Sequence, residues 1–314
     1  VFPLLFTGIA LHVVPWIPVA RRLSFGASGT EIRWPPLLLA ILLSFASTSI
    51  VSYLLFLSKT FLWIWVLIAN TIIGLVLLFF FRHNPSASLF SLPKYDSPWY
   101  RYALLIILLS CSIRAVFILI VHSPLSPDSF VHSRMIQRLL EFEKPLPGAL
   151  IYPLGMHGFF SSVALGTDPS QFHLLLPVLN NISFSLIVTF WIFSIVRDER
   201  LAFFAVLIFL VFPLNPFAIV INKSFQPLPQ AFSYTMIAAI LYEICSKDER
   251  IRLSIVFLFG LASASFHNIT ALYGSLLISG FVIGNILFNV DGIEINKRRV
   301  ATIFAITLLF PIAV

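Results

Sequence analysis

Apolar runs of about 20 residues recur along most of the chain, separated by short links that hold most of the charged residues. As helices, such runs are long enough to cross the roughly 30 Å hydrocarbon core of a membrane. The predicted spans cover about 1–20, 34–57, 60–81, 102–121, 172–196, 201–221, 228–245, 252–267, 269–288 and 300–314. The pattern predicts an all-α polytopic membrane protein with about nine or ten transmembrane helices.

One helical stretch, residues 126–143, does not fit the pattern of a membrane span. Ser126 can cap a helix that has Pro127 in its first turn, and apolar residues then recur at helical spacing. We expect this amphipathic juxtamembrane helix to lie in the interface, with its apolar face in lipid and its polar face in water. Asp128 and His132, at positions i and i+4, would share the polar face.

A second exception, residues 151–166, is apolar but short and interrupted by glycine, histidine and serine. If it crossed the membrane, Arg197 and Arg200 would lie outside and every later basic loop would be inverted. If it only dips into the membrane, 14 of the 20 Lys and Arg are cytoplasmic, five lie outside and Arg114 lies within a span. The positive-inside rule favours the second arrangement, which puts the Asp128 helix in an extracytoplasmic loop.

Composition supports this interpretation and narrows the classes of partner. The chain is 59% hydrophobic and 11% charged, which excludes a soluble domain and predicts contact with membrane lipid. The net charge of +7 sits in short loops between spans, so we expect no nucleic-acid partner. Cys111 and Cys245 fall within predicted spans and suggest neither a disulfide framework nor a thiolate metal site. Since the sequence ends in an apolar run, we expect it to continue beyond Val314.

The polar residues predicted for the outer face are few and rich in histidine. They include five of the seven histidines and the only two outer aspartates, namely His122, His132, His157, His173, His267, Asp128 and Asp168. Histidine titrates near neutrality and serves as base, acid or ligand. Asp128 is a candidate general base or ligand for a divalent cation such as Mg²⁺ or Mn²⁺. Its alternative role is to complement the helix dipole from the first turn.

Other polar residues are candidates for binding a phosphate or a sugar. Arg114 lies about seven residues from the outer end of its predicted span, so it either clamps a lipid phosphate or snorkels to an internal partner. Lys223, with Asn222 and Gln226, follows another span and could bind a diphosphate or a sugar hydroxyl. The simpler interpretation is that Pro227 and Pro229 mark a rigid turn before the next span. The predicted substrate-binding residues are Arg114, Tyr152, His157, Asn222, Lys223, Gln226 and His267.

The order of these features resembles the polytopic glycosyltransferases of the GT-C fold. The resemblance rests on a span containing Arg114, then Pro127-Asp128, an interfacial helix with His132, and the segment from Tyr152 to His157. In that superfamily the first outer loop follows a span, holds the key acid and forms juxtamembrane helices that do not cross. The resemblance covers about 101–314 as a GT-C-like core, with 1–100 as an N-terminal three-helix membrane extension.

What the resemblance implies is transfer of a sugar from a polyprenyl-phosphate donor at the extracytoplasmic face of a multi-pass cell-membrane protein. Asp128 would be the catalytic acid of the first loop, with His132 beside it. The second outer link lacks a carboxylate, and no Trp-Trp-Asp motif is present, so transfer of an oligosaccharide to asparagine fits less well than transfer of a single sugar. The alternative is a multi-pass transporter or a flippase for lipid-linked saccharides, and a non-catalytic scaffold is a third hypothesis.

Overall fold

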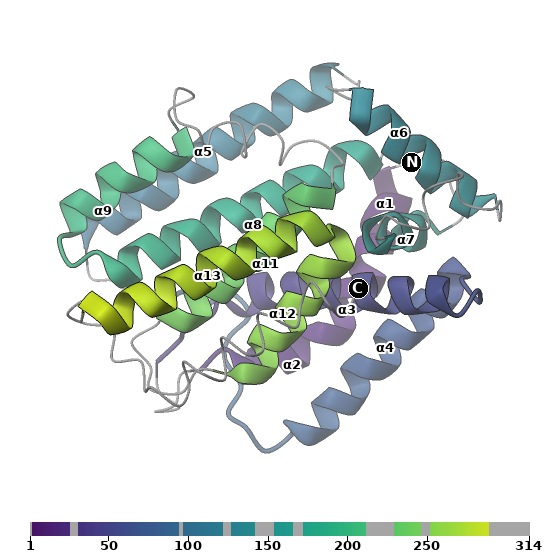
Figure 1. The fold of residues 1–314 in the computed structure, drawn as a ribbon, viewed down its shortest axis with the longest axis horizontal. Coiled ribbons are helices and arrows are strands. Elements are labelled where there is room, and N and C mark those ends of the chain that lie inside the picture. Colours follow the sequence, from purple (N-terminus) through teal and green to yellow (C-terminus); the bar gives the residue numbers. More distant parts are fainter. Residues whose placement is uncertain are drawn as a thin grey trace.

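The computed structural model describes eight stretches of the chain, and the regular elements in them are helices (Figure 1). The described residues are 2–25, 31–93, 97–121, 127–141, 154–165, 172–211, 229–245 and 252–288. Within these ranges, β-type pairing is limited to an isolated bridge between Phe25 and Ile32. The predicted all-α architecture is confirmed for this part of the chain.

The helices begin where the sequence supplies a suitable first turn. Pro36, Pro98 and Pro127 each open a helix, where a missing backbone N–H costs nothing. The elements are α1 (Phe2–Val13), η1 (Val14–Trp16), α2 (Ile17–Leu23), α3 (Pro36–Leu57), α4 (Trp63–Phe80), α5 (Pro98–Val121), α6 (Pro127–Leu140), α7 (Gly155–Val163), α8 (Phe172–Ile195), α9 (Glu199–Val206), the π-turn η4 (Leu207–Val211), α11 (Pro229–Cys245), α12 (Leu253–Phe266) and α13 (Asn268–Phe288).

Three of the described helices are long and apolar enough to cross a membrane. They are α3, α4 and the Leu176–Ile195 part of α8. Shorter apolar segments lie in α5, α12 and α13. These helices are consistent with a membrane protein, and the count of nine or ten spans stays a prediction.

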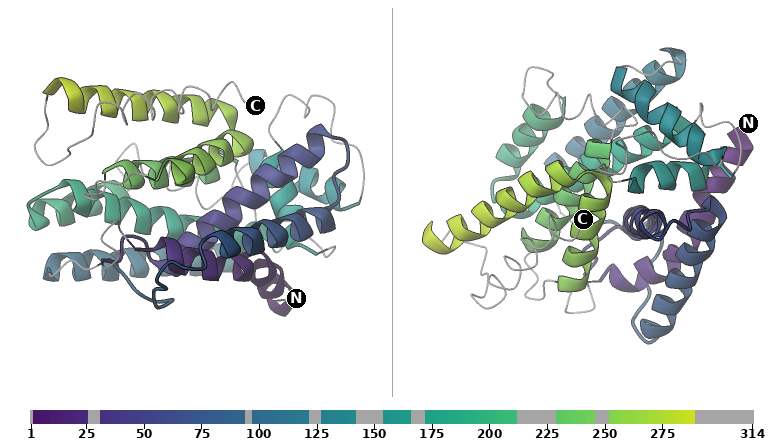
Figure 2. Two further views of the ribbon diagram at one scale, coloured as in Figure 1. Left: turned by 90° about the horizontal axis from the view of Figure 1, so that it is seen from below. Right: turned by 45° about the vertical axis from the view of Figure 1, so that its right-hand side comes forward.

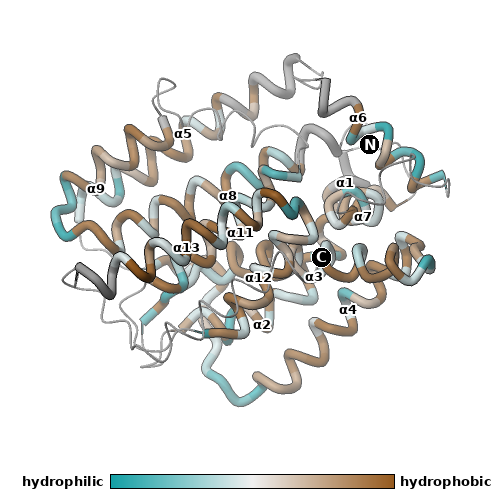
Figure 3. The backbone as a smooth tube through the Cα atoms, viewed as in Figure 1, coloured by the Kyte–Doolittle hydropathy of each residue, from teal (hydrophilic) through white to brown (hydrophobic). Residues whose placement is uncertain are grey.

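The described helices expose many apolar side chains, and the interior helix α3 buries several hydroxyl groups. A soluble protein instead exposes mainly polar side chains. Only 17% of the apolar window of α4 is buried, and the helix carries exposed Ile, Leu, Val and Phe side chains. Figure 3 shows α4 coloured as hydrophobic along most of its length. The helix α13 lies along one margin of the bundle in both views of Figure 2 and exposes a similar face. The buried helix α3 packs against α2, α4, α7 and α12, and it buries five hydroxyl side chains, Ser44, Ser47, Thr48, Ser49 and Ser52. Apolar side chains outside and hydroxyls inside suit a lipid environment.

The predicted boundary at residue 100 does not separate two hydrophobic cores in the structure. One core cluster contains Phe45 of α3, Phe160 of α7 and Phe232 of α11. The Phe45 and Phe232 rings lie 5.8 Å apart, and those of Phe160 and Phe232 lie 5.6 Å apart. The N-terminal helices are therefore packed into the bundle, and the division into an extension and a core stays a prediction.

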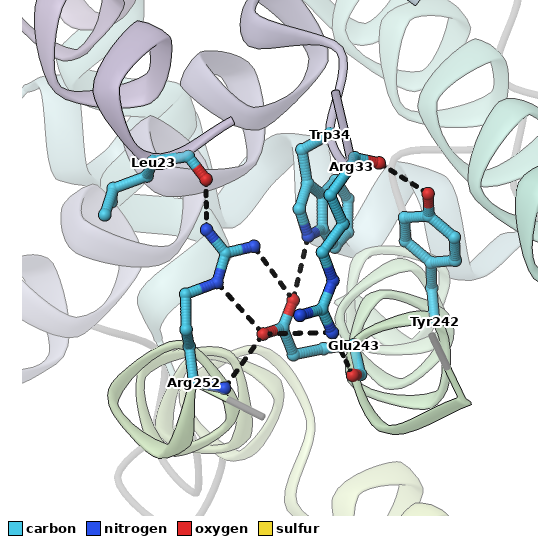
Figure 4. Close-up of polar contacts among 6 residues, drawn as sticks. All are labelled: Leu23, Arg33, Trp34, Tyr242, Glu243 and Arg252. Atoms are coloured by element: carbon cyan, nitrogen blue, oxygen red, sulfur yellow. Dashed lines mark hydrogen bonds and ion pairs between the residues drawn. The ribbon is translucent and has the colours of Figure 1, made fainter. Parts of the chain in front are cut away.

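One end of the bundle is held by a buried ionic network around Glu243, which we call the Glu243 cluster (Figure 4). The Glu243 carboxylate is fully buried near the end of α11 and pairs with two guanidinium groups, at 3.3 Å from Arg33 and 3.1 Å from Arg252. It also accepts hydrogen bonds from the Trp34 indole N–H at 2.9 Å and from the Arg252 backbone N–H at 3.0 Å.

Two further bonds extend the Glu243 cluster to neighbouring segments. Arg252 also donates to the Leu23 carbonyl at the end of α2, and the Tyr242 hydroxyl donates to the Arg33 carbonyl at 2.5 Å. The cluster therefore joins the α2–α3 link to the α11–α12 link, although more than 200 residues of sequence separate Arg33 from its partners.

Two further basic residues, Arg21 and Arg200, lie at the same end of the bundle, and the charge pattern predicted both on the cytoplasmic side. The Arg21 side chain donates to the Ala87 carbonyl at 2.6 Å, which ties the α4–α5 link to α2. The Arg200 guanidinium lies 5.7 Å from the Trp99 ring, beside the start of α5. Phe190, near the end of α8, contacts the ring of Tyr242 at 6.1 Å.

The segment between α5 and α8 begins and ends at the opposite end of the bundle. Tyr100 contacts Phe193 at 5.3 Å, and Cys111 Sγ donates to the side-chain Oδ1 of Asn181 at 3.5 Å, so α5 and α8 lie side by side and antiparallel. The end of α5 and the start of α8 therefore lie at the same end of the bundle. This arrangement is consistent with the predicted non-crossing loop, which stays a prediction.

Replacing Glu243 with glutamine should destabilise the fold strongly. The substitution leaves the buried Arg33 and the partly buried Arg252 without a counter-charge, and breaking such a network costs about 3–5 kcal/mol. The free energy of unfolding in detergent micelles measures the effect. Glu141→Gln, at an exposed acid directly after α6, is the matched control and should change stability by less than about 0.5 kcal/mol. Equal effects at the two positions would show that the Glu243 cluster does not hold the bundle.

Candidate functional site

The end of the bundle opposite the Glu243 cluster contains a short, entirely buried helix. The nine residues of α7 are all buried, and they span only about 13 Å, less than half of a membrane crossing. Glycines allow this close packing, because a Cβ at Gly155 would collide with Ser49 Oγ and with the Ser265 carbonyl oxygen. The glycines that interrupt the apolar run in the sequence are thus the residues that let α7 enter between α3 and α12.

The amphipathic helix α6 packs on α7 with its apolar face, which corrects the expectation that this face lies in lipid. Met135, Ile136 and Leu139 are buried in the protein. Arg134 and Gln137 are exposed on the other side. The apolar stripe was identified correctly, but its partner is another helix, because α7 offers a buried apolar surface at the same end.

Two predicted site residues, His132 on α6 and His157 on α7, are in direct contact. His132 Nδ1 lies 2.8 Å from His157 Nε2, and the ring centroids are 5.0 Å apart. His157 is fully buried, whereas His132 is half-buried and does not lie on a fully wet face as expected. The Ser161 hydroxyl, one turn beyond His157, donates to the His157 carbonyl at 2.8 Å and lies 3.4 Å from the Ile136 carbonyl.

The contact between the two imidazoles defines what the pair can do chemically. One of the facing nitrogens must carry a proton and the other must be bare, so the pair shares one hydrogen between two bases. Two imidazolium ions at this separation would repel each other. In this pair the buried His157 can orient the more exposed His132. The second ring nitrogen of His132 could then accept a proton from another molecule.

His267, predicted to bind substrate, has a clear structural task. It stands between α12 and α13, and its Nδ1 accepts hydrogen bonds from the Thr270 backbone N–H at 3.1 Å and from the Thr270 hydroxyl at 2.8 Å. An acceptor Nδ1 requires a neutral ring that carries its proton on Nε2. The residue therefore caps the start of α13, and substrate binding by it stays a prediction.

The remaining predicted site residues fall partly or wholly outside the described structure. Tyr152, Asn222, Lys223 and Gln226 lie outside the described residues, as do His122 and Asp168. The positions of Arg114, Asp128 and His173 fall within α5, α6 and α8, but their side chains are not described. Asp128 lies one helical turn before His132. Among the described side chains no group of three His, Cys, Asp or Glu could hold a metal ion, so a metal at Asp128 stays a prediction.

Two polar features of the structure were not predicted from the sequence. Glu243 is the one acid in α11, and this isolated charge in an apolar helix was the available signal. His12 is buried between α1, α3 and α4, where its carbonyl accepts from Ser44 at 2.9 Å and from Asn70 at 3.0 Å. Asn70 also accepts from the Trp16 indole at 2.9 Å, so this network ties the first helices together.

The two cysteines lie inside helices, Cys111 in α5 and Cys245 at the end of α11. Cys111 and Cys245 are both free and buried, and the Trp191 indole N–H lies 3.2 Å from Cys245 Sγ.

Comparisons of the chain with protein-family models, with curated proteins and with solved structures found no match. The function proposed below therefore rests on the residues of this chain.

A double-mutant cycle on His132 and His157 should detect their direct contact. Replacing either residue with alanine removes the shared hydrogen bond, so the two losses in unfolding free energy should depart from additivity by about 1 kcal/mol. The control cycle pairs His132→Ala with His83→Ala, an exposed histidine at the basic end, and should be additive within about 0.5 kcal/mol. Additivity in both cycles would contradict the contact.

Proposed function

We propose that this chain is an integral-membrane glycosyltransferase that moves a sugar from a polyprenyl-phosphate donor to an acceptor at the extracytoplasmic face. The observation that carries the proposal is the contact of His132 with His157. The contact joins two short helices in a loop that leaves and returns at the same end of the bundle. Asp128 stands one turn before His132, shortly after the end of α5.

The proposed reaction is an inverting displacement at the anomeric carbon. His132 takes the proton of the acceptor hydroxyl, whose oxygen then forms the new bond to the sugar. The bond from the sugar to the phosphate oxygen breaks, and the polyprenyl phosphate leaves with the electron pair. His157 orients His132 through the shared hydrogen bond, and Asp128 stabilises the imidazolium that forms, or holds a divalent cation if one takes part.

Three further features support this proposal. The order of span, acidic loop and non-crossing helices is the order found in the GT-C superfamily that the sequence resembles. The basic links gather at the opposite end of the bundle, and the positive-inside rule assigns that end to the cytoplasm. The acceptor and the lipid-borne sugar would therefore meet at an outer, lipid-facing site.

A second candidate is a multi-pass transporter or a flippase for lipid-linked saccharides. The network of His12, Asn70, Thr48 and Ser44 favours it, because buried polar groups within apolar helices commonly mark substrate pathways. The two candidates differ in their product. A transferase forms a new glycosidic bond, whereas a flippase moves the donor across the membrane unchanged.

Replacing Asp128 with asparagine and, separately, His132 with glutamine should each lower sugar transfer about 100-fold or more, because each removes a proton-handling or charged group beside the reacting atoms. Transfer from a radiolabelled polyprenyl-phosphate sugar in isolated membranes measures the effect. Glu141→Gln, exposed just beyond the end of the same helix, is the control and should retain activity. Full activity in both site variants would remove this loop from the mechanism.

A further inference from the structure

The turn that ends α3 has a lysine at a position that favours glycine. The Thr60 backbone N–H donates to the Leu55 carbonyl at 3.0 Å, a bond that closes the last turn of many helices. In this arrangement the residue before Thr60, Lys59, takes a left-handed conformation with a φ of 59°. Glycine adopts that conformation with less strain than any residue with a side chain. The turn itself therefore gives no reason for a lysine, and the task of its side chain must lie elsewhere.

The aromatic residues on either side of Lys59 contact the two helices that carry the histidine pair. Phe56 and Phe61 stack on each other, with their ring centroids 4.0 Å apart. Phe56 packs against Met135 of α6, one turn beyond the histidine of that helix. A Cβ on Gly158 of α7, the residue after the other histidine, would lie 3.0 Å from the Phe61 ring. The α3–α4 turn, with Lys59 in it, is therefore packed beside the contact between the histidines.

The side chain of Lys59 is exposed, and no carboxylate in the described part of the chain pairs with it. The ion pairs between described residues belong to Glu243, at the opposite end of α3. The next helix, α4, begins at Trp63 and exposes Ile64, Ile68 and Ile72 at helical spacing, as a lipid-facing helix does. A free ammonium at the end of a lipid-facing helix is well placed to meet the phosphate of a lipid.

We propose that Lys59 binds the phosphate of a lipid beside the contact of His132 with His157, while the apolar chain of that lipid lies along the exposed side chains of α4. The ammonium donates to the phosphate oxygens and meets their charge. The site rests on the proposed function for the identity of the lipid, which would be the polyprenyl-phosphate donor. It assigns a substrate-binding residue to the part of the chain that the sequence predicted to be a separate extension.

The test measures binding separately from sugar transfer. The full chain in detergent is titrated with a long-chain polyprenyl monophosphate, and bound lipid is counted by native mass spectrometry. Lys59→Gln removes the charge and should weaken binding roughly tenfold, since the lost hydrogen bond joins two charged groups. Lys59→Arg keeps the charge and should bind like the wild type. Arg82→Gln, at an exposed basic residue just beyond the other end of α4, is the matched control and should also bind normally.

Glycine at position 59 separates a binding role from a structural one. Lys59→Gly relieves the left-handed conformation, so its thermal unfolding temperature should equal or exceed that of the wild type, while binding should fall as far as in Lys59→Gln. If the lysine only complements the dipole of α3, both variants bind the lipid like the wild type, and the site is overturned. Loss of binding that always accompanies a lower unfolding temperature, or an equal loss in Arg82→Gln, overturns it as well.

Competing lipids identify the source of the phosphate. Competition by phosphatidic acid as strong as by the polyprenyl lipid supports the site but removes the polyprenyl donor from it. Binding of the uncharged polyprenol as tight as that of its phosphate overturns the site. A chain that binds the phosphate lipid through Lys59 but transfers no sugar would refute the proposed function and leave the site standing. Sugar transfer by Lys59→Gln with an unchanged KM for the donor would refute the site and leave the proposed function standing.

Discussion

The carboxylate of Glu243 is the interaction on which the arrangement of this bundle depends. A buried carboxylate is stable only if its charge is met by well-placed partners, and here two arginines and an indole provide them from segments far apart in sequence. Because Arg33 and Arg252 belong to different links, their pairing with one acid fixes α2, α3, α11 and α12 at a common end. That end is closed by direct bonds between the links, and the described helices α6 and α7, which come between α5 and α8 in the sequence, lie at the other end.

At that other end the packing depends on small and hydroxyl-bearing residues instead of charges. Gly155 and Gly158 bring the backbone of α7 against α3, where Ser49 bonds to Ser265 of α12 at 2.5 Å. Helices in lipid associate through such close contacts, since burying apolar surface gives little advantage there. The result is a tightly packed short helix that holds His157 in place, and a covering helix that brings His132 to it. The contact of His132 with His157 is thus built on supported helices and not on an open loop.

The sequence predicted those features that follow from periodicity and charge. The apolar runs located α3, α4 and α8, and the balance of Arg197, Arg200 and the later basic links predicted that 151–166 would not cross. It could not predict features that require knowledge of which distant segments meet. The partner of the apolar stripe on α6 depends on the placement of α7, and the pairing of Glu243 joins residues about 210 positions apart. His12 was overlooked for the same reason, because nothing local indicates that α3 and α4 surround it with polar groups.

The proposed function requires that α6 and the basic end of the bundle face opposite sides of the membrane, with α6 outside. Single cysteines test this most directly, in a background where the buried Cys111 and Cys245 are replaced. Cysteines at the exposed positions Arg134 on α6 and Arg200 at the start of α9 would be treated with an impermeant maleimide in intact cells. We predict labelling at position 134 at once, and at position 200 only after the membrane is permeabilised. Labelling of both positions from the same side, or of position 134 only after permeabilisation, would contradict this arrangement.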